Sequence, residues 1–327
     1  MTGYNSIFFS NKKLALPKLT PAQKRQRAPL KSNAKAFELT YTHFSVVQNK
    51  KRKFAFYSAT NIDGKTWEAK VDDRDDFEID VRVSASHQTG NELYDFYKSK
   101  TANDFDRGHI TKFQDPQWGD DSTIEQAAKD TMKFVNCVPQ HHRLNRGAWK
   151  SLEDYILKKF TRKTGANGSK LTVFAGPLLL DNDPFYIDKI KGKAIQIPCH
   201  FWKIVVYPNK KNKLSAAAFL MSQKEILFKH NFVVSKKTEV RGAAKAVTEA
   251  DFFTDFTSGE PYQVRIDFLE EVTGYRFGLK TYLQPYTKQE ATELIYKRVE
   301  VPSLAKRFET RAFKDQPLSF EFEGIRL

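Results

Sequence analysis

The sequence is poor in cysteine, since Cys137 and Cys199 are the only two among 327 residues. Two cysteines cannot build the disulfide framework of a small secreted fold, so the chain suits a reducing compartment, although one bridge between them stays open. Neither Cys-x-x-Cys nor paired-His spacing accompanies His141, His142 or His200. A zinc site is therefore not expected, and His200 is interpreted as a hydrogen-bonded core residue.

Long apolar runs are also missing. No stretch approaches the roughly 18 to 20 apolar residues of a membrane span. Residues 1–13 show neither the basic start, the apolar run nor the small-residue cleavage site of a signal peptide. We therefore expect a protein without membrane contact that stays inside the cell, in the cytoplasm, while export as a toxin by another route stays open.

Acidic residues are too few to balance the basic ones, with 39 Asp and Glu against 54 Lys and Arg and a net charge of +15. Such a surplus favours polyanionic partners, because neutralising phosphates releases counterions, although many basic proteins have no such partner. Residues 12–35 hold eight basic side chains, three prolines and no acid. This composition predicts a flexible N-terminal arm over residues 1–36 that adds affinity for nucleic acid, packs on a partner or the cleft, or stays solvated.

Glycine-rich phosphate loops, internal repeats and interdomain linkers are not apparent. Nothing between residues 40 and 285 resembles a linker, so we expect one α/β domain at residues 37–285 and a C-terminal extension at 286–327. The basic turn at residues 49–53 joins two expected strands and is interpreted as a solubilising face.

Alternating or continuous apolar patterns predict the elements of this domain. We expect an α+β fold with a mixed, mainly antiparallel central sheet flanked by helices. Strands are expected at residues 37–61, 170–180, 194–207, 213–221 and at the very end of the chain, with helices at 92–97, from 144 to near 165, and at 265–277. The acidic stretch at residues 72–80 is expected to lie away from a polyanionic substrate.

The residues that carry chemistry gather between Asp104 and Tyr155. His109 offers an imidazole that is mostly neutral at physiological pH and can accept a proton from water. Arg107 offers a planar fork that matches two phosphate oxygens, and Gly108 lets the backbone bring both side chains together. Because His109 must be neutral to act, activity should decline below about pH 6.

A metal ligand is expected one helix further on. Asn145 lies in the first turn of an apolar-periodic helix, and a carboxamide oxygen together with substrate phosphate suffices for Mg²⁺, which keeps most of its waters. Glu153 follows eight residues later, a rise of roughly 12 Å, so it is unlikely to share the metal. Glu153 is instead expected to hold a metal-bound water or to orient its neighbours.

Taken alone, Asp-Arg-Gly-His at residues 106–109 is equally compatible with a structural histidine. Two further segments favour a catalytic histidine: Asn-Cys-Val-Pro-Gln at 136–140, and Leu-Asn through Trp to Leu-Glu at 144–153. Together they resemble the DNA/RNA non-specific endonucleases of the ββα-metal class, the family of endonuclease G and the Serratia-type nuclease. The resemblance covers residues 37 to 285.

The resemblance implies a ββα-metal active site that cleaves DNA and RNA with little sequence preference, using Mg²⁺ or, in its place, Mn²⁺. It implies His109 as general base and Asn145 as the metal ligand. The further catalytic candidates are Asp106, Arg107, Asn136 and Glu153, and the candidates for contacts with nucleic acid are Arg107, Arg143 and Arg146. One departure is a longer connection from His109 to Asn136, which carries Asp115, Asp120, Asp121 and Glu125 and leaves the cleft rim undefined.

Two rival functions stay open. The first is a nucleic-acid-binding protein that kept the fold and lost catalysis, and the second is a magnesium enzyme that acts on a small phosphodiester. Because an unrestrained nuclease is toxic, we expect an inhibitory or activating protein partner, a separate compartment or cleavage of the arm, as suits a toxin, a defence effector or a death nuclease. A homodimer is compatible with these features.

Overall fold

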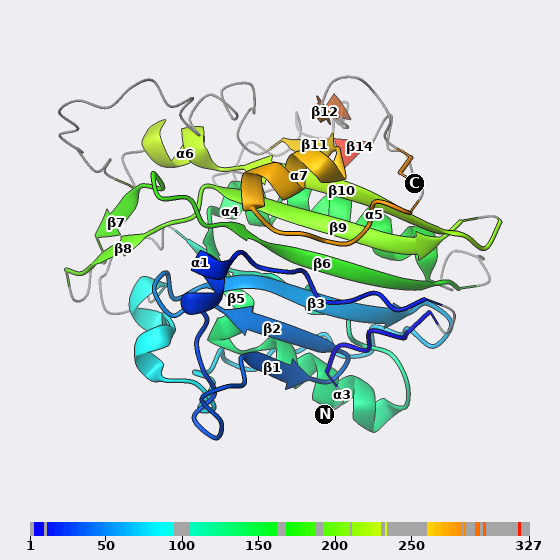
Figure 1. Ribbon diagram of the computed structural model, residues 1–327, viewed down its shortest axis with the longest axis horizontal. Coiled ribbons are helices and arrows are strands. Elements are labelled where there is room, and N and C mark those ends of the chain that lie inside the picture. Colours follow the sequence, from blue (N-terminus) through cyan, green and yellow to red (C-terminus); the bar gives the residue numbers. More distant parts are fainter. Residues whose placement is uncertain are drawn as a thin grey trace, which may run out of the picture.

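The computed structural model describes residues 3–9, 12–94, 105–161, 168–187, 192–209, 211–229, 233, 260–282, 284–285, 292–294, 297–298 and 320–321. The strands of its main sheet are β1 (Glu38–Tyr41), β2 (Phe44–Gln48), β3 (Ala55–Asp63), β6 (Lys170–Leu178), β9 (His200–Pro208), β10 (Leu214–Ser222), β11 (Pro261–Val264) and β12 (Thr292–Leu294). They form an eight-stranded sheet in the order β1-β2-β3-β6-β9-β10-β11-β12 (Figure 1).

Smaller elements surround this sheet. The helices are α1 (Pro21–Arg25), α3 (Asp121–Thr131), α4 (His142–Asn145), α5 (Ala148–Phe160), α6 (Lys224–Lys229) and α7 (Ile266–Thr273), with 3-10 turns η1 (Ala85–His87), η2 (Asn91–Leu93) and η3 (Phe134–Asn136). The remaining strands pair in twos: β4 (Asp106–His109) with β5 (Cys137–Gln140), β7 (Phe185–Ile187) with β8 (Ala194–Gln196), and β13 (Lys297–Arg298) with β14 (Phe320–Glu321).

The predicted α+β class with a large antiparallel sheet and flanking helices is confirmed. Every pairing between named strands in the described part of the chain is antiparallel, so the sheet is more uniform than the mixed sheet we expected. No helix in that part is long and apolar enough to cross a bilayer.

Several expected elements are divided by local breaks. The first expected strand splits into β1 and β2 at His43, whose φ of 67° reverses the chain. The strand expected at 194–207 splits into β8 and β9 around Pro198, which cannot donate to a ladder. The helix expected from residue 144 becomes α4 and α5, divided at Gly147. Each break coincides with a residue that tolerates or imposes a turn.

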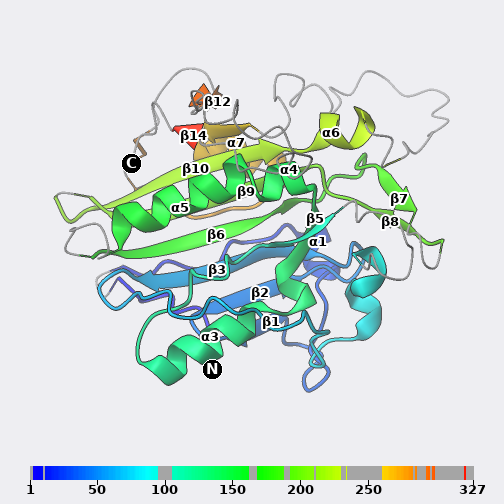
Figure 2. The same ribbon diagram turned by 180° about the vertical axis from the view of Figure 1, so that it is seen from behind.

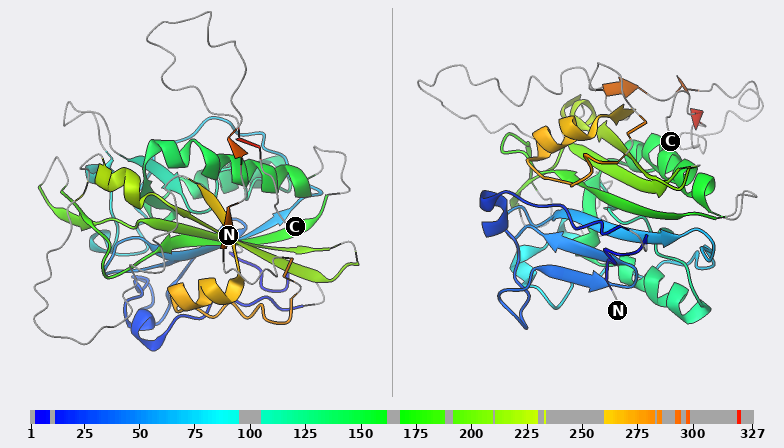
Figure 3. Two further views of the ribbon diagram at one scale, coloured as in Figure 1. Left: turned by 90° about the horizontal axis from the view of Figure 1, so that it is seen from above. Right: turned by 45° about the vertical axis from the view of Figure 1, so that its right-hand side comes forward.

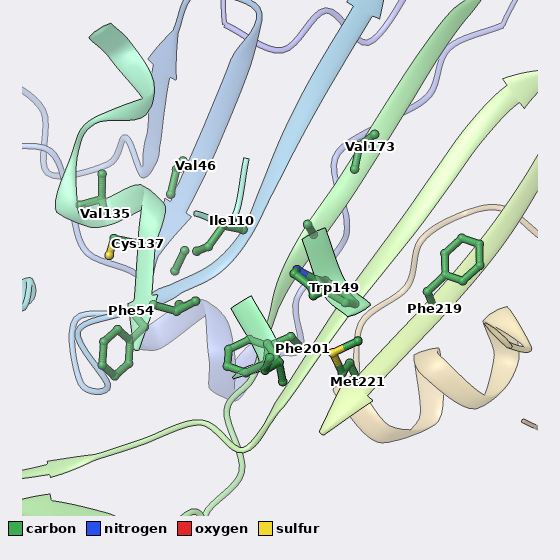
Figure 4. Packing of buried hydrophobic residues seen from close by; sticks show 14 of the residues in the cluster. Val46, Phe54, Ile110, Val135, Cys137, Trp149, Val173, Phe201, Phe219 and Met221 are labelled. Carbon is green, nitrogen blue, oxygen red and sulfur yellow. The ribbon is translucent and has the colours of Figure 1, made fainter. Parts of the chain in front are cut away.

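The two faces of the sheet carry separate apolar cores. One core joins Trp149, Leu152 and Ile156 of α5 to strand residues such as Val173 and Phe219, and Figure 4 shows several of these side chains packed together. Figure 2 shows α5 and α3 across this face, and Figure 3 shows α7 on the opposite one. The ββα segment therefore lies on one face of the sheet, and the arm and α7 cover the other.

The expectation of a flexible arm is not met in residues 3–9 and 12–36. The backbone N–H of Gly3 donates to the carbonyl of Tyr41 at 3.0 Å, and α1 begins with a capping box between Thr20 and Gln23. Leu14 and Leu19 are buried in the second core, at 2% and 8% exposure. The arm packs because these apolar side chains are buried against the sheet, although the overall composition of the arm is basic.

The expected helix at 92–97 begins one residue early as η2, and residues 95–97 lie outside the described part of the chain. The expected helix at 265–277 is α7, which ends at Gly274 in a left-handed conformation (φ 70°). Of the C-terminal extension, only residues 292–294, 297–298 and 320–321 are described. The short strand β14 lies within the segment where an edge strand was expected.

Candidate active site

The candidate active-site residues come from a strand–strand–helix unit. β4 pairs with β5 so that Gly108 lies opposite Val138 and His109 opposite Cys137, and α4 and α5 follow at once. The side chain of Gln140 crosses directly over Gly108, and a Cβ atom built at that position would overlap its amide group. Only glycine fits there, which is a packing reason for the glycine between Arg107 and His109.

A polar cleft of about 500 Å³ opens beside this unit. Its lining holds more cations than carboxylates, with Phe77, Phe113 and Met132 as the apolar part. The charged or polar lining residues are Arg74, Asp75, Asp76, Asp106, Arg107, His109, Lys112, Gln114, Asn145, Arg146, Lys150 and Glu153. Six of the eight predicted site residues thus meet in one place; Asn136 and Arg143 do not line it.

His109 lies between two aromatic rings, with centroid distances of 4.9 Å to Phe77 and 6.2 Å to Phe113. Its Nε2 atom is buried and has no hydrogen-bond partner among the described residues. Burial, reinforced by the positive charges of Arg74 and Lys112, lowers the pKa of His109 to about 3. The imidazole therefore stays neutral down to well below physiological pH. The neutral imidazole is the form that accepts a proton.

Asp106 orients the candidate metal ligand. Its Oδ2 accepts hydrogen bonds from Nδ2 of Asn145 at 3.0 Å and from Nε of Arg146 at 2.8 Å, and its Oδ1 accepts from Arg146 at 2.7 Å. With its nitrogen held in this way, Asn145 keeps Oδ1 for another partner. The bidentate contact with Arg146 also balances the carboxylate charge.

The donor set around Asn145 suits a hard cation that keeps most of its waters. Among the described residues, no three His, Cys, Asp or Glu side chains gather as a metal site. A metal here would depend on the Asn145 carboxamide oxygen, on water and on substrate phosphate, which is the coordination that Mg²⁺ tolerates and zinc does not favour. The residues present therefore fit a weakly held magnesium ion.

Glu153 is held from behind by a buried lysine. Nζ of Lys203, in the middle of β9, donates to Oε1 of Glu153 at 2.8 Å, and the two side chains are only 3% and 10% exposed. Asp115 lies close enough to both charges to be affected by them, and its burial raises its pKa to about 6. This arrangement fixes the Glu153 carboxylate at the cleft wall, because an unpaired buried charge would be costly.

Two predicted residues mainly shape the site. Asn136 is completely buried, and its amide accepts from the Thr111 N–H and donates to the carbonyls of Thr111 and Thr131. It therefore fixes the chain just after β4. Arg107 donates to Oδ1 of Asn91 at 3.0 Å, while its Nε is buried without a partner among the described residues, so one donor remains for a ligand.

The longer connection after β4 resolves into α3. Asp120 caps its first turn, and Asp121 pairs with Lys70 at 2.7 Å. Glu125 faces a separate shallow depression beside residues 70–75. Of the four acids in this connection, only Asp115 approaches the site.

The acidic stretch at residues 72–80 lies beside the cleft. Arg74, Asp75 and Asp76 line the cleft, and the Arg74 guanidinium lies over the Phe113 ring at 4.8 Å. The stretch that we expected away from the substrate therefore borders the candidate cleft. A single arginine inside a run of aspartates was a signal, as was the one lysine, Lys203, inside an apolar strand.

An imidazole, an oriented amide oxygen and several guanidinium groups thus line one cleft, and this set of groups suits hydrolysis of a phosphodiester. The family model for DNA/RNA non-specific endonucleases matches residues 22–283, which is most of the chain. The chain therefore belongs to the DNA/RNA non-specific endonuclease family.

Several characterised and uncharacterised proteins are similar to this chain. The uncharacterized protein y4fB of Sinorhizobium fredii is 36% identical over 228 residues, 68% of this chain and 33% of that protein. The nuclease of Nostoc sp. is 25% identical over 256 residues, 76% of each. A chain in the crystal structure of the EndoG/EndoGI complex is 19% identical with a TM-score of 0.48, covering 73% of this chain and 84% of that one.

The mitochondrial nuclease EXOG of Danio rerio is 29% identical over 132 residues, 38% of this chain. The matched segments span only about a third of the length of y4fB and EXOG, 33% and 36%.

Proposed function

We propose that this chain is a Mg²⁺-dependent endonuclease that hydrolyses DNA and RNA with little sequence preference, and that Mn²⁺ can replace Mg²⁺. The observation that carries the proposal is the cleft itself, in which a neutral, half-buried His109 and the carboxamide oxygen of Asn145 are brought together. The surrounding surplus of cations suits a polyanion. The absence of a groove-reading module among the predicted elements suits recognition of phosphate and sugar.

In this proposal, His109 removes a proton from a water molecule, and the water oxygen attacks the phosphorus as the bond to the 3′ oxygen breaks. The products are a 5′-phosphate and a 3′-hydroxyl, whose proton comes from solvent. Arg74 and Arg107 stabilise negative charge on the phosphoryl oxygens. A magnesium ion held by Asn145 would supply Lewis-acid stabilisation of the same phosphate and the leaving oxygen.

Three residues support this chemistry without reacting. Asp106 holds the Asn145 amide so that its oxygen is available. Glu153, fixed by Lys203, orients water at the cleft wall. Asn136 fixes the turn that follows His109. The candidates for further contacts with nucleic acid are Arg146, whose fork already engages Asp106, and Arg143, which is exposed outside the cleft.

The test is incubation of purified protein with supercoiled plasmid and with RNA, in Mg²⁺, in Mn²⁺ or in a chelator, beside His109→Ala. We expect loss of both substrates in either metal, none in chelator, and a rate about 10²- to 10⁴-fold lower in the variant. Circular dichroism controls for folding of the variant. Cleavage that persists undiminished in His109→Ala would refute the role of the base.

The same proposal includes restraint of the activity inside the producing cell, by an inhibitory or activating protein partner or by compartment. Its motive is that an assembled site of this kind damages any nucleic acid it meets. Toxicity of the chain on expression, relieved by co-expression of neighbouring genes, would identify such a partner. Equal growth with and without expression of the wild type would contradict an inhibitory partner.

A further inference from the structure

Two basic segments that are separate in the sequence lie side by side in the structure. The backbone N–H of Lys50 donates to the carbonyl of Gln26, that of Ala28 donates to the carbonyl of Gln48, both at 2.8 Å, and Arg27 bridges to Asn49. The end of the arm is thereby joined to the turn between β2 and β3. In Figure 1, α1 lies beside this end of the sheet.

The result is a basic surface of six cations, which we define as Lys24, Arg25, Arg27, Lys50, Lys51 and Lys53. All are exposed except Arg27, which is half-buried with its guanidinium 3.9 Å from the Phe37 ring. The Glu38 carboxylate lies near Arg27, and the Asp183 carboxylate is paired with Arg52 of the turn. The surface therefore keeps a surplus of positive charge after these neighbours are counted.

The buried side chain of Arg52 holds the turn rigid. It donates to the Leu180 carbonyl at 2.8 Å and pairs with Asp183 at 2.7 Å, with both side chains almost fully buried. The lysines on either side of Arg52 thus project from a fixed backbone. A fixed array of charges loses less entropy on binding than a flexible tail does.

A short path connects the basic surface to the cleft. The Gln48 amide donates to the His87 carbonyl at 2.9 Å, and burial together with the charges of Lys50 and Lys53 lowers the pKa of His87. Four residues further on, Asn91 accepts a hydrogen bond from Arg107 in the cleft. The stretch of four residues from His87 to Asn91 spans at most about 14 Å, which is about four base pairs of a duplex at 3.4 Å each.

We infer that the basic surface binds the backbone of a nucleic-acid duplex whose scissile phosphate lies in the cleft. This inference rests on the proposed function and adds to it a preference for long polymers over short ones. The exposed acids of residues 72–76 at the cleft repel phosphate, so a long duplex leaves the cleft by way of Arg107 and Asn91. The two segments act together because neither alone carries the full array.

The test compares two triple variants that lose the same charge. In one, Lys50, Lys51 and Lys53 become Gln, and in the control, Lys65, Lys211 and Lys213 become Gln. The control lysines are also exposed, but they lie at the other end of the sheet, since Asp63 pairs with Lys170 and Leu214 with Pro208. Binding is measured in a His109→Ala background, so that it does not depend on cleavage.

We expect the variant of the basic surface to bind a duplex of about 40 base pairs at least tenfold more weakly at 0.15 M salt, with a slope of log K against log salt smaller by about 2 to 3. The control should match the parent. With His109 restored, cleavage of a dinucleotide, which is too short to reach from the cleft to the basic surface, should be the same in all three proteins. Absence of any cleavage would refute the proposed function alone, because the binding comparison remains valid.

Equal salt slopes for the two triple variants would overturn the inference. So would loss of binding to phosphatidylserine vesicles with unchanged binding to DNA, since that result would assign the basic surface to a membrane.

Discussion

His109 shows how strongly its surroundings change a single residue. Aromatic rings on two sides and cations nearby leave it neutral, with a pKa of about 3. Below pH 6.5 the imidazole of the unfolded chain binds a proton, whereas the imidazole of the folded chain stays neutral. His109 therefore lowers the stability of the fold progressively as the pH falls from about 6.5 to 3. The same environment keeps the imidazole in the neutral form that the proposed base requires.

This pKa changes the expected pH profile. We expect kcat/KM to stay level from pH 7 down to about pH 5, in place of the decline below pH 6 that a free imidazole gives. Asp115 titrates in the same range, because burial raises its pKa to about 6, so Asp115→Asn is the control. An acid limb near pH 6 that survives in Asp115→Asn would contradict the assignment of His109 as a buried base.

The candidate site was predictable residue by residue where the motif is contiguous. The contiguous motif segments predict four site residues that line one cleft: Asp106, His109, Asn145 and Glu153. The motif does not predict Arg74 or Lys203, because their partners are distant in the chain. Lys203, for example, lies 50 residues from Glu153. A contact of that range depends on strand register, which the sequence does not specify locally.

At the scale of elements, the pairing of β4 with β5 depends on a glycine. In Gly108→Ala, the new methyl group would collide with the Gln140 side chain, which is only 1% exposed and cannot move freely. We expect a loss of about 1 to 3 kcal/mol in the free energy of unfolding. We also expect at least a tenfold lower kcat, since displacement of His109 by about 1 Å can cost 10²-fold.

Urea unfolding and plasmid cleavage measure the two effects. The double variant Gly108→Ala with Gln140→Ala removes the collision, so it should recover part of both losses relative to Gly108→Ala. Full activity in the single variant would mean that Gln140 moves aside without displacing the base.

Element types were more predictable than element limits. The apolar period that predicts a helix from residue 144 is real in α5, but Gly147 interrupts it, and α5 begins without a side-chain cap. Similarly, Pro198 was a visible sign of the break between β8 and β9. The split at His43 was not foreseen, because a left-handed histidine has no signature in hydrophobic alternation.

At the scale of the whole molecule, the arm is part of the fold. Deletion of residues 1–36 would remove Leu14 and Leu19 from the second core, and burial of each contributes about 1.5 to 3 kcal/mol. We expect a melting temperature lower by roughly 10 °C, measured by calorimetry. Cleavage of a short duplex per folded molecule should be unchanged.

The full-length variant Leu14→Ala with Leu19→Ala is the matched control, and it should reproduce part of the loss in melting temperature, because Tyr4 and Phe8 are also buried. An unchanged melting temperature together with higher activity in the deletion would show a detachable inhibitory segment instead. Composition could not predict this packing, because it averages a few apolar side chains over a basic segment, whereas burial is decided one side chain at a time.

The pair of hydrogen bonds between Lys18 and Arg276 has a consequence for synthesis of the chain. Each backbone N–H donates to the other carbonyl, at 2.9 and 3.0 Å, so the bonds join positions 258 residues apart. At translation rates of about 5 to 20 residues per second, the first partner waits about 13 to 50 s for the second. During that interval the apolar face that the segments near Arg276 later cover is exposed on the ribosome. A holding chaperone would bind to this face.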